Sequence, residues 1–198
     1  APDVQIKLAR KDGAAPGSTA TPFKVKDSVK STDKIMGKST ATAAQMAAAY
    51  KRAGRSSPSN VYASKGASTI DAFAQIVANE AEAEGVRADV VFAQAMLETG
   101  WLSFGGSVKA SQCNFAGIGA VNAQAGGATF KNVAEGIRAQ VQHLKAYACT
   151  DKLNKPCVDP RFHLVKRGCA PLITDLNGKW AVPGTTYGQN IIGIIARF

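Results

Sequence analysis

One stretch of the chain, Val86 to Glu98, is apolar on nearly every side of the helix that it predicts. Its apolar residues recur at helical spacing, and one buried stripe would contain Ala88, Val91, Phe92 and Ala95. A helix without a polar face has to lie inside a domain, because any exposed side would leave apolar surface in water. The stretch therefore predicts a central helix around which the rest of the fold packs.

Other segments show the apolar spacing or the end signals of helices. An alanine-rich stretch from about Ser39 stops at Gly54, and a second helix begins near Ser68 and ends at Gly85. A third begins after Asn132, with an apolar face made of Val133, Ile137, Val141 and Leu144. A last one is QNIIGIIARF. The sequence predicts a mainly α domain of five or so helices.

Residues 100–130 interrupt this helical pattern. They contain GWLSFGG, CNFAGIGA and AGGATF, and so many glycines favour tight turns or a close approach of the backbone. We expect a small lobe of loops or a β-hairpin here. Residues 1–33 combine short alternating pieces such as VQIKL with the stretch DGAAPGSTATP, and are interpreted as a basic N-terminal segment or linker with one or two strands. Residues 34–198 would then form the folded domain.

The net charge of +10 is concentrated near the N-terminus. Residues 1–66 hold twelve Lys/Arg against four Asp/Glu, and residues 67–198 hold twelve against ten. A basic segment of this kind suits a polyanion such as nucleic acid, anionic lipid or an anionic cell-wall polymer, although a merely solubilising surface fits equally well. No apolar run reaches the roughly eighteen residues of a membrane span, and the basic helix or aromatic sheet of nucleic-acid binders is missing.

The four cysteines all lie in the second half of the chain: Cys113, Cys149, Cys157 and Cys169. None has the C-x-x-C spacing of a zinc site, and the two histidines do not complete one, so no metal is predicted. Four cysteines allow three pairings, and an exported protein with one or two disulfides is an open alternative. Ala1 fits the mature end left by a removed signal peptide, or an arbitrary start.

Two motifs and their surroundings resemble a known family. AQAMLETGW, a helix ending in Glu-Thr-Gly-Trp, and NFAGIGA are similar to the glucosaminidase domain of glycoside hydrolase family 73. The likeness continues from about residue 34 to the end, and is closest to the secreted Firmicute branch, in these pieces: KIMGKSTATAAQM, EAEGVRADVVFAQAMLETGWLSFGG, AEGIRAQVQHLKAYA, VDPRFHLVKRG and GKWAVPGTTYGQNI. The resemblance implies a lysozyme-like helical fold, cleavage of peptidoglycan without a cofactor, and a location outside the cell at the wall.

Glu98 is the candidate catalytic acid. Breaking a glycosidic bond requires a protonated carboxylic acid at the leaving oxygen. Glu98 ends an apolar helix, where desolvation and the negative helix C-terminus both raise the pKa of a carboxyl group and keep its proton available near neutral pH. On these properties alone, an ordinary solvent-facing glutamate is an equal alternative. The resemblance implies the catalytic role.

A second catalytic carboxylate is not evident. No Asp or Glu occurs between residues 101 and 134, where many members of the family are thought to have one. Glu135 fits a capping box, and Asp151 and Asp159 fit turn or cap positions. Two routes need no second carboxylate: attack by the substrate's own 2-acetamido oxygen, or assistance from a tyrosine hydroxyl.

The resemblance implies further site residues. Tyr187, which precedes the last helix, is the assisting tyrosine, with Trp180 and Tyr147 as competing candidates. The implied substrate-lining set is Trp101, Phe104, Asn114, Phe115, Gly117, Ile118 and Trp180. Asn114 can hydrogen-bond an acetamido group, and the faces of Trp101 and Phe104 can stack on a pyranose ring, although lid residues packed on the core would show the same pattern.

The sequence therefore predicts an exported endo-β-N-acetylglucosaminidase that cleaves the β-1,4 bonds of peptidoglycan glycan strands. Glu98 would act as general acid, and the basic N-terminal region would hold anionic cell-wall polymer. Two alternatives stay open. One is a lytic transglycosylase or muramidase with the same glutamate, and the other is a catalytically inactive glycan-binding module, which the missing carboxylate favours.

Overall fold

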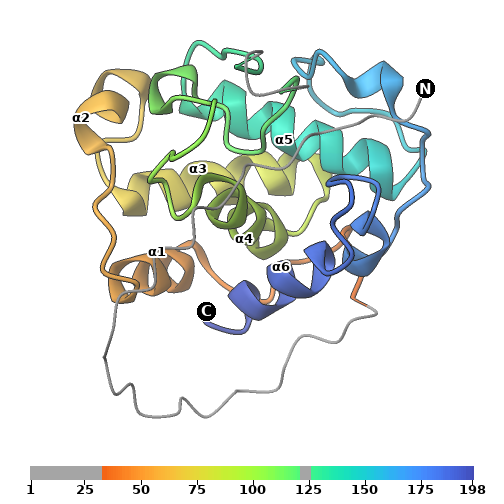
Figure 1. Cartoon of the computed structure of the whole chain (residues 1–198), viewed down its shortest axis with the longest axis horizontal. Helices are drawn as coiled ribbons and strands as arrows, with labels where there is room; N and C mark the ends of the chain where they lie inside the picture. The colour runs from red at the N-terminus through yellow and green to blue at the C-terminus, as the bar shows by residue number, and fades with distance from the viewer. Residues whose placement is uncertain (1–32, 121–125) are drawn as a thin grey trace.

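Six α-helices form the framework of the described part of the chain, residues 33–120 and 126–198, in the computed structural model (Figure 1). The helices are α1 (Ala43–Arg52), α2 (Ser59–Tyr62), α3 (Ile70–Glu84), α4 (Ala88–Thr99), α5 (Val133–Ala148) and α6 (Tyr187–Ile195). Within these residues pairing between extended segments is limited to isolated bridges and no β-strand forms. The prediction of a mainly α, lysozyme-like domain is confirmed, while the strands expected in residues 1–30 lie outside the described residues.

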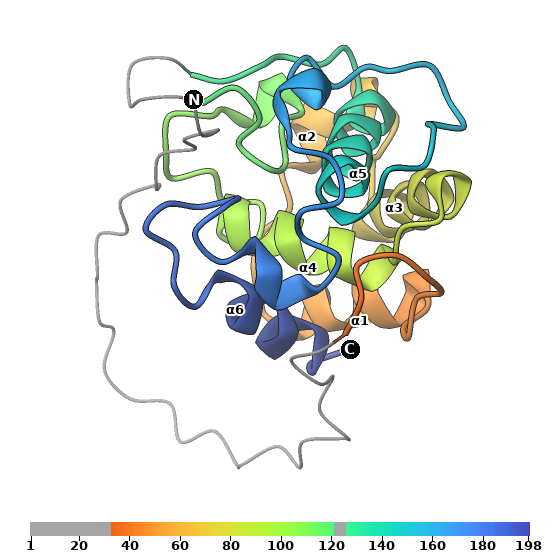
Figure 2. The same cartoon turned by 90° about the vertical axis from the view of Figure 1, so that its right-hand side faces the viewer.

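Helix α4 lies at the centre of the domain, as its apolar pattern predicts. Val90, Val91 and Phe92 have no exposed surface, and neither do most of the other side chains of this helix. Figures 1 and 2 show α4 between α5 and α6, with α3 packed against both α4 and α5. A residue in the last turn of α4 is therefore held by packing from several sides.

A buried ion pair secures the first turn of α4. Asp89 is fully buried, and one of its carboxylate oxygens accepts hydrogen bonds from Arg87 Nη2 (2.8 Å) and from the backbone N–H of Thr40 (3.0 Å). Burial alone would raise the pKa of Asp89, but the hydrogen bonds from Arg87 and Thr40 lower it below its ordinary value. The Arg87 N–H also donates to the carbonyl of Ile35, which ties the segment before α1 to α4.

Local signals set most of the helix ends. Helix α3 begins one residue later than predicted, because the hydroxyl of Thr69 rather than that of Ser68 accepts from the N–H of Ala72 (3.1 Å). Helix α5 begins as predicted, since Asn132 Oδ1 accepts from the N–H of Glu135 (2.8 Å). The Glu135 carboxylate accepts from the N–H of Lys131 (2.7 Å), so its role is to cap α5.

The glycine-rich lobe between α4 and α5 is irregular. Its described part, residues 100–120 and 126–132, contains one short 3₁₀ turn, Ala110–Gln112, and no strand, which favours loops over the hairpin alternative. The lobe packs closely on α5: a Cβ added at Gly136 would overlap the carbonyl oxygen of Cys113. Gly136 is therefore what permits the lobe to sit directly on the helix.

Two classes of feature are missing from the described residues. They contain no helix long and apolar enough to cross a membrane, and no cluster of three or more His, Cys, Asp or Glu side chains that could hold a metal ion. Cys113, Cys149, Cys157 and Cys169 are all free thiols, so none of the pairings that the sequence allows is formed.

We expect Gly136→Ala to lower the free energy of unfolding by more than about 2 kcal/mol, because the new methyl group has to displace the Cys113 backbone. Gly193→Ala is the matched control, since a Cβ at this helical glycine meets no atom within 4 Å. The control should be neutral or stabilising by up to about 1 kcal/mol. Urea unfolding measures both values, and equal effects would contradict the close contact at Gly136.

Candidate active site

Glu98 lies in the last turn of α4, which ends at Gly100 in a left-handed conformation (φ 59°). Its side chain is half-buried and faces the first residue of α6. The Tyr187 hydroxyl donates a short hydrogen bond of 2.5 Å to Glu98 Oε1. Two residues separated by 89 positions in the sequence are thus joined at their functional groups.

A chain of hydrogen bonds sets the direction of the Tyr187 proton. The carbonyl oxygen of Val91 can only accept, so Gln140 must present its NH₂ group to it (3.0 Å). The same Nε2 donates to Gln94 Oε1 (2.9 Å), which leaves Gln94 Nε2 to donate to the Tyr187 hydroxyl oxygen (2.9 Å). The Tyr187 hydroxyl therefore accepts a hydrogen bond from Gln94 and donates one to Glu98.

The pKa of Glu98 is raised to about 7. Burial is the main cause, and two neighbours oppose it: the hydrogen bond from Tyr187 and the nearby indole N–H of Trp180. Burial and the neighbouring Glu98 also raise the pKa of Tyr187 well above its ordinary value, so the phenol stays protonated. Near neutral pH the pair therefore consists of a neutral tyrosine and a carboxyl group that is about half protonated.

Glu98 differs from the buried residues Glu80, Glu84 and Asp89 in having no cationic partner within residues 33–120 and 126–198. Glu84 pairs with Lys145 Nζ (2.8 Å), and Glu80 pairs with Arg138 Nε (2.9 Å). Burial would raise the pKa of each of these two carboxylates, but their cationic partners bring it below the ordinary value. At Glu98 the neighbouring donors are neutral and do not offset the effect of burial, so the pKa of this carboxyl group is raised.

An aromatic wall stands behind Glu98. Trp180 is 1% exposed, and its indole N–H makes no hydrogen bond of normal geometry within the described residues, although it is near enough to lower the pKa of Glu98. Its ring packs edge-on against His143, with 4.7 Å between centroids, and His143 Nδ1 lies 2.7 Å from Asp159 Oδ2. Tyr147 also packs against Trp180, with 5.6 Å between ring centroids, and its hydroxyl donates to the carbonyl of Lys179 (3.3 Å).

Asn114, which the sequence predicts to line the site, uses its amide group to hydrogen-bond the lobe from which it comes. Asn114 is 1% exposed, and its amide donates to the carbonyls of Ile118 (2.8 Å) and Ala128 (3.1 Å). Phe115 and Ile118 are equally buried, in the core. The hydrogen bonds of Asn114 occupy its amide donors and hold the lobe together from inside.

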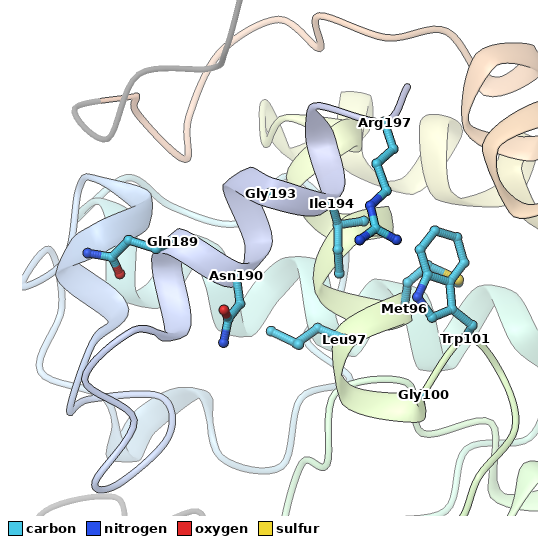
Figure 3. A pocket seen from close by; sticks show the side chains of 9 residues that line it. All are labelled: Met96, Leu97, Gly100, Trp101, Gln189, Asn190, Gly193, Ile194 and Arg197. Atoms are coloured by element: carbon cyan, nitrogen blue, oxygen red, sulfur yellow. The ribbon is translucent and has the colours of Figure 1, made fainter. Parts of the chain in front are cut away.

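A narrow pocket of about 20 Å³ opens at Glu98 toward the lobe. Its lining combines the end of α4 with the lobe: Glu98, Thr99, Phe104, Gly105, Gly106, Val108, Asn114 and Gly117. It brings Glu98 together with Phe104, Asn114 and Gly117 from the predicted set, while Trp101 lies outside its lining. Trp101 lines a larger groove of about 290 Å³ between the end of α4 and α6 (Figure 3).

The other candidate carboxylates have structural partners away from Glu98. Glu135 caps α5, Asp159 binds His143 and the N–H of Arg161, and Asp151 is exposed on its loop. No acidic side chain is among the groups of the described residues that shift the pKa of Glu98. The site thus presents one carboxyl group, one phenol and one indole N–H.

Sequence reasoning missed Gln94 and Gln140. Both are fully buried amides in apolar helix faces, which is itself a signal, because a buried polar side chain requires a partner. Gln94 also stands one helical turn before Glu98, on the same side of α4. The partner of either amide could not be read from the sequence, since they come from different helices.

Comparison with known proteins adds three findings. The family model "Glucosaminidase", described as mannosyl-glycoprotein endo-beta-N-acetylglucosaminidase, matches residues 74–198, a stretch that includes α4, the lobe, α5 and α6. A Borreliella burgdorferi protein described as "Uncharacterized protein" is 50% identical over 112 residues, which are 57% of this chain and 55% of that protein. The chain thus spans about half the length of this relative. No solved structure matches the chain.

The raised pKa of Glu98 predicts a pH-dependent stability cost. The unfolded carboxyl ionises near 4.5 and the folded one near 7, so ionisation favours the unfolded chain as pH rises between these values, and wild-type stability falls there. We expect Glu98→Gln to stabilise the protein by about 2–3 kcal/mol at pH 8 and hardly at all at pH 4. Urea unfolding at both values tests this. Glu84→Gln leaves Lys145 buried without its carboxylate and should destabilise the protein at pH 8. If both variants changed the free energy of unfolding in the same direction at pH 8, the raised pKa of Glu98 would be contradicted.

The direction of the Tyr187 hydrogen bond predicts how the pKa of Glu98 responds to substitution. Tyr187→Phe removes the donor that favours the carboxylate, so the pKa of Glu98 should rise above about 7. Gln94→Leu should raise it less, because the hydroxyl stays but is less polarised. Titration of ¹³C-labelled glutamate side chains by NMR measures both. Tyr147→Phe is the control, and an equal rise there would count against the hydrogen-bond chain.

Proposed function

The chain belongs to the glucosaminidase family, a family of glycoside hydrolases, and we propose that it is an endo-β-N-acetylglucosaminidase that cleaves the β-1,4 bonds of peptidoglycan with Glu98 as general acid. One observation carries the assignment of the acid. Glu98 is a half-buried carboxyl group whose pKa is raised to about 7, and it lies at a pocket between the central helix and the lobe. A group with this pKa can release a proton near neutral pH and regain it in each turnover.

The hydrogen bonds distinguish the two oxygens of Glu98. Oε1 accepts from Tyr187, so the transferable proton belongs on Oε2. Tyr187 steadies the carboxylate that remains after the proton has left, and Gln94 orients that tyrosine from behind. In this scheme Glu98 is the catalytic residue of the acid step, and Tyr187 assists it.

The proposal includes attack by the substrate's own acetamido group, because no carboxylate of the described residues faces Glu98 as a nucleophile. The acetamido carbonyl oxygen would form a bond to the anomeric carbon as the glycosidic C–O bond breaks, and Glu98 would protonate the departing oxygen. Water would then attack the anomeric carbon, reopen the oxazolinium ring and return a proton to Glu98. The product keeps the anomeric configuration of the substrate.

The same single acid supports a second candidate. In a lytic transglycosylase the substrate's own hydroxyl captures the anomeric carbon, and no protein base opposite the acid is needed. A muramidase would use Glu98 on the other bond of the repeat. A glycan-binding module without activity would keep the pocket and lose the need for a raised pKa at Glu98. The products of digestion separate these cases.

Export and wall binding are part of the proposal. A peptidoglycan substrate lies outside the cytoplasmic membrane, and the basic surplus of residues 1–66 suits an anionic wall polymer. Half of that surplus comes before α1, the first of the folded helices, and we propose that this part tethers the domain to the wall.

We expect Glu98→Gln to lower kcat on purified peptidoglycan by about 10²–10⁴-fold while the glycan still binds. In the wild type, kcat/KM should fall above about pH 7, where Glu98 loses its proton. Glu135→Gln, at the cap of α5, serves as the active control. Mass spectrometry of the digest reads the bond cleaved: reducing GlcNAc ends support the proposal, whereas reducing MurNAc or anhydro-MurNAc ends, or no release by the wild type, would overturn it.

A further inference from the structure

The groove between α4 and α6 has no role in the acid step. It holds about 290 Å³ and lies beside the turn that carries Glu98 (Figure 3). Its lining comes from the end of α4 and the outer stripe of α6: Met96, Leu97, Gly100, Trp101, Gln189, Asn190, Gly193, Ile194 and Arg197. This volume is close to the lower end of the range for small-ligand sites and fits about one sugar ring.

Gly193 keeps this groove open at a cost to its helix. A glycine inside a helix costs about 0.5–1 kcal/mol relative to alanine, and it is usually retained where another part of the chain packs too closely for a side chain. Here a Cβ would meet no atom within 4 Å, and the residue is exposed. Packing of the chain therefore does not require glycine at this position. A ligand in the groove would require it, because any side chain here would occupy the space in which the ligand lies.

Trp101 forms one wall of the groove in a backbone conformation that is unfavourable for its residue type. Gly100, Trp101 and Leu102 have φ values of 59°, 59° and 60°, and the left-handed region costs a non-glycine residue about 1–2 kcal/mol. The indole is held by Tyr50, whose ring centroid lies 6.1 Å away and whose hydroxyl donates to the Trp101 carbonyl (3.2 Å). Strained residues that are held in this way concentrate at binding sites.

Arg197 adds a positive charge at the same place. Its guanidinium carbon lies 6.0 Å from the centroid of the Trp101 ring, and no ion pair to it forms within residues 33–120 and 126–198. The backbone there is anchored, since Arg52 Nη2 donates to the Arg197 carbonyl (2.7 Å). In Figure 3 the guanidinium lies beside the indole, and the amide of Asn190, from the same side of the groove as Arg197, lies near Leu97.

These groups match one class of ligand. An indole face suits the apolar face of a pyranose, a side-chain amide suits an acetamido group, and a free guanidinium suits a carboxylate in a bidentate pair. We propose that the α4–α6 groove binds an N-acetylated sugar that carries a carboxylate, on the sugar itself or on its attached peptide, next to the bond that is cleaved. The inference rests on the proposed function for its substrate, and it gives the chain a way to tell peptidoglycan from chitin.

Binding to the inactive Glu98→Gln protein tests the inference without requiring cleavage. Three glycans serve as probes: peptidoglycan strands with their peptides, strands stripped of peptides, and chitin oligomers, which have no carboxylate. Adding Arg197→Gln should raise Kd about 10-fold or more for carboxylated strands, as expected for a lost charge-assisted hydrogen bond, and leave chitin binding unchanged. Arg55→Gln, at an exposed arginine outside the groove, is the matched control.

The two carboxylate sources give different patterns. A loss of affinity for both kinds of strand places the carboxylate on the sugar, and a loss for peptide-bearing strands alone places it on the peptide. An equal change for all three glycans, or no change, would overturn the inference. Gly193→Leu places a side chain at the groove wall, where its Cβ meets no atom within 4 Å, and should weaken binding of all three glycans; unchanged binding would equally refute the inference.

The two proposals fail in different ways. If the wild type releases no sugar from peptidoglycan but Arg197→Gln selectively weakens carboxylated strands, the groove is a binding site and the enzymatic proposal is wrong. If the wild type cleaves peptidoglycan and the Arg197 and Gly193 substitutions leave binding and KM unchanged, the enzyme stands without this binding site.

Discussion

Burial of α4 on all sides is the constraint on which the rest of the structure depends. No face of this helix is left for solvent until its last turn, so α3, α5 and α6 have to pack around it and the segment before α1 has to close over its start. Glu98 comes at the point where this enclosure ends. The carboxyl group is therefore dry enough to hold a proton near neutral pH and still open to a pocket on one side.

The electrostatic design of the domain rests on a contrast between paired and unpaired acids. Glu80, Glu84 and Asp89 each have cationic partners, and their carboxylates act as structural charges that tie loops and helix ends together. Glu98 has neutral donors instead. A lysine or arginine near Glu98 would make the site more stable at neutral pH and would abolish its use as an acid, because the proton would be lost at low pH. The ionised form of Glu98 thus lowers the stability of the folded domain, and the same lack of a cationic partner lets this residue serve as the proposed acid.

Much of the fold could be predicted from the sequence because it is encoded locally. The central position of α4, the cap at Asn132 and the end of α3 at Gly85 follow from spacing and end signals within single helices. The rest depends on contacts between distant segments. Gln94 meets Gln140 and Tyr187 across 46 and 93 residues, and Asn114 turns inward to bond the lobe rather than outward to a ligand. Periodicity gives the face of a helix that is buried but not the partner that a buried polar group will find.

The two tryptophans of the chain lie in different surroundings. Trp180 is enclosed beside Glu98 and stacked edge-on against His143, whereas Trp101 stands half-exposed in the α4–α6 groove. Their indoles therefore experience different solvation, and each adjoins a different part of the proposed glycan path. Emission from the buried indole would respond to the charge on Glu98, and emission from the other to a sugar ring laid on its face. The chain thus contains a separate built-in optical reporter for chemistry and for substrate capture.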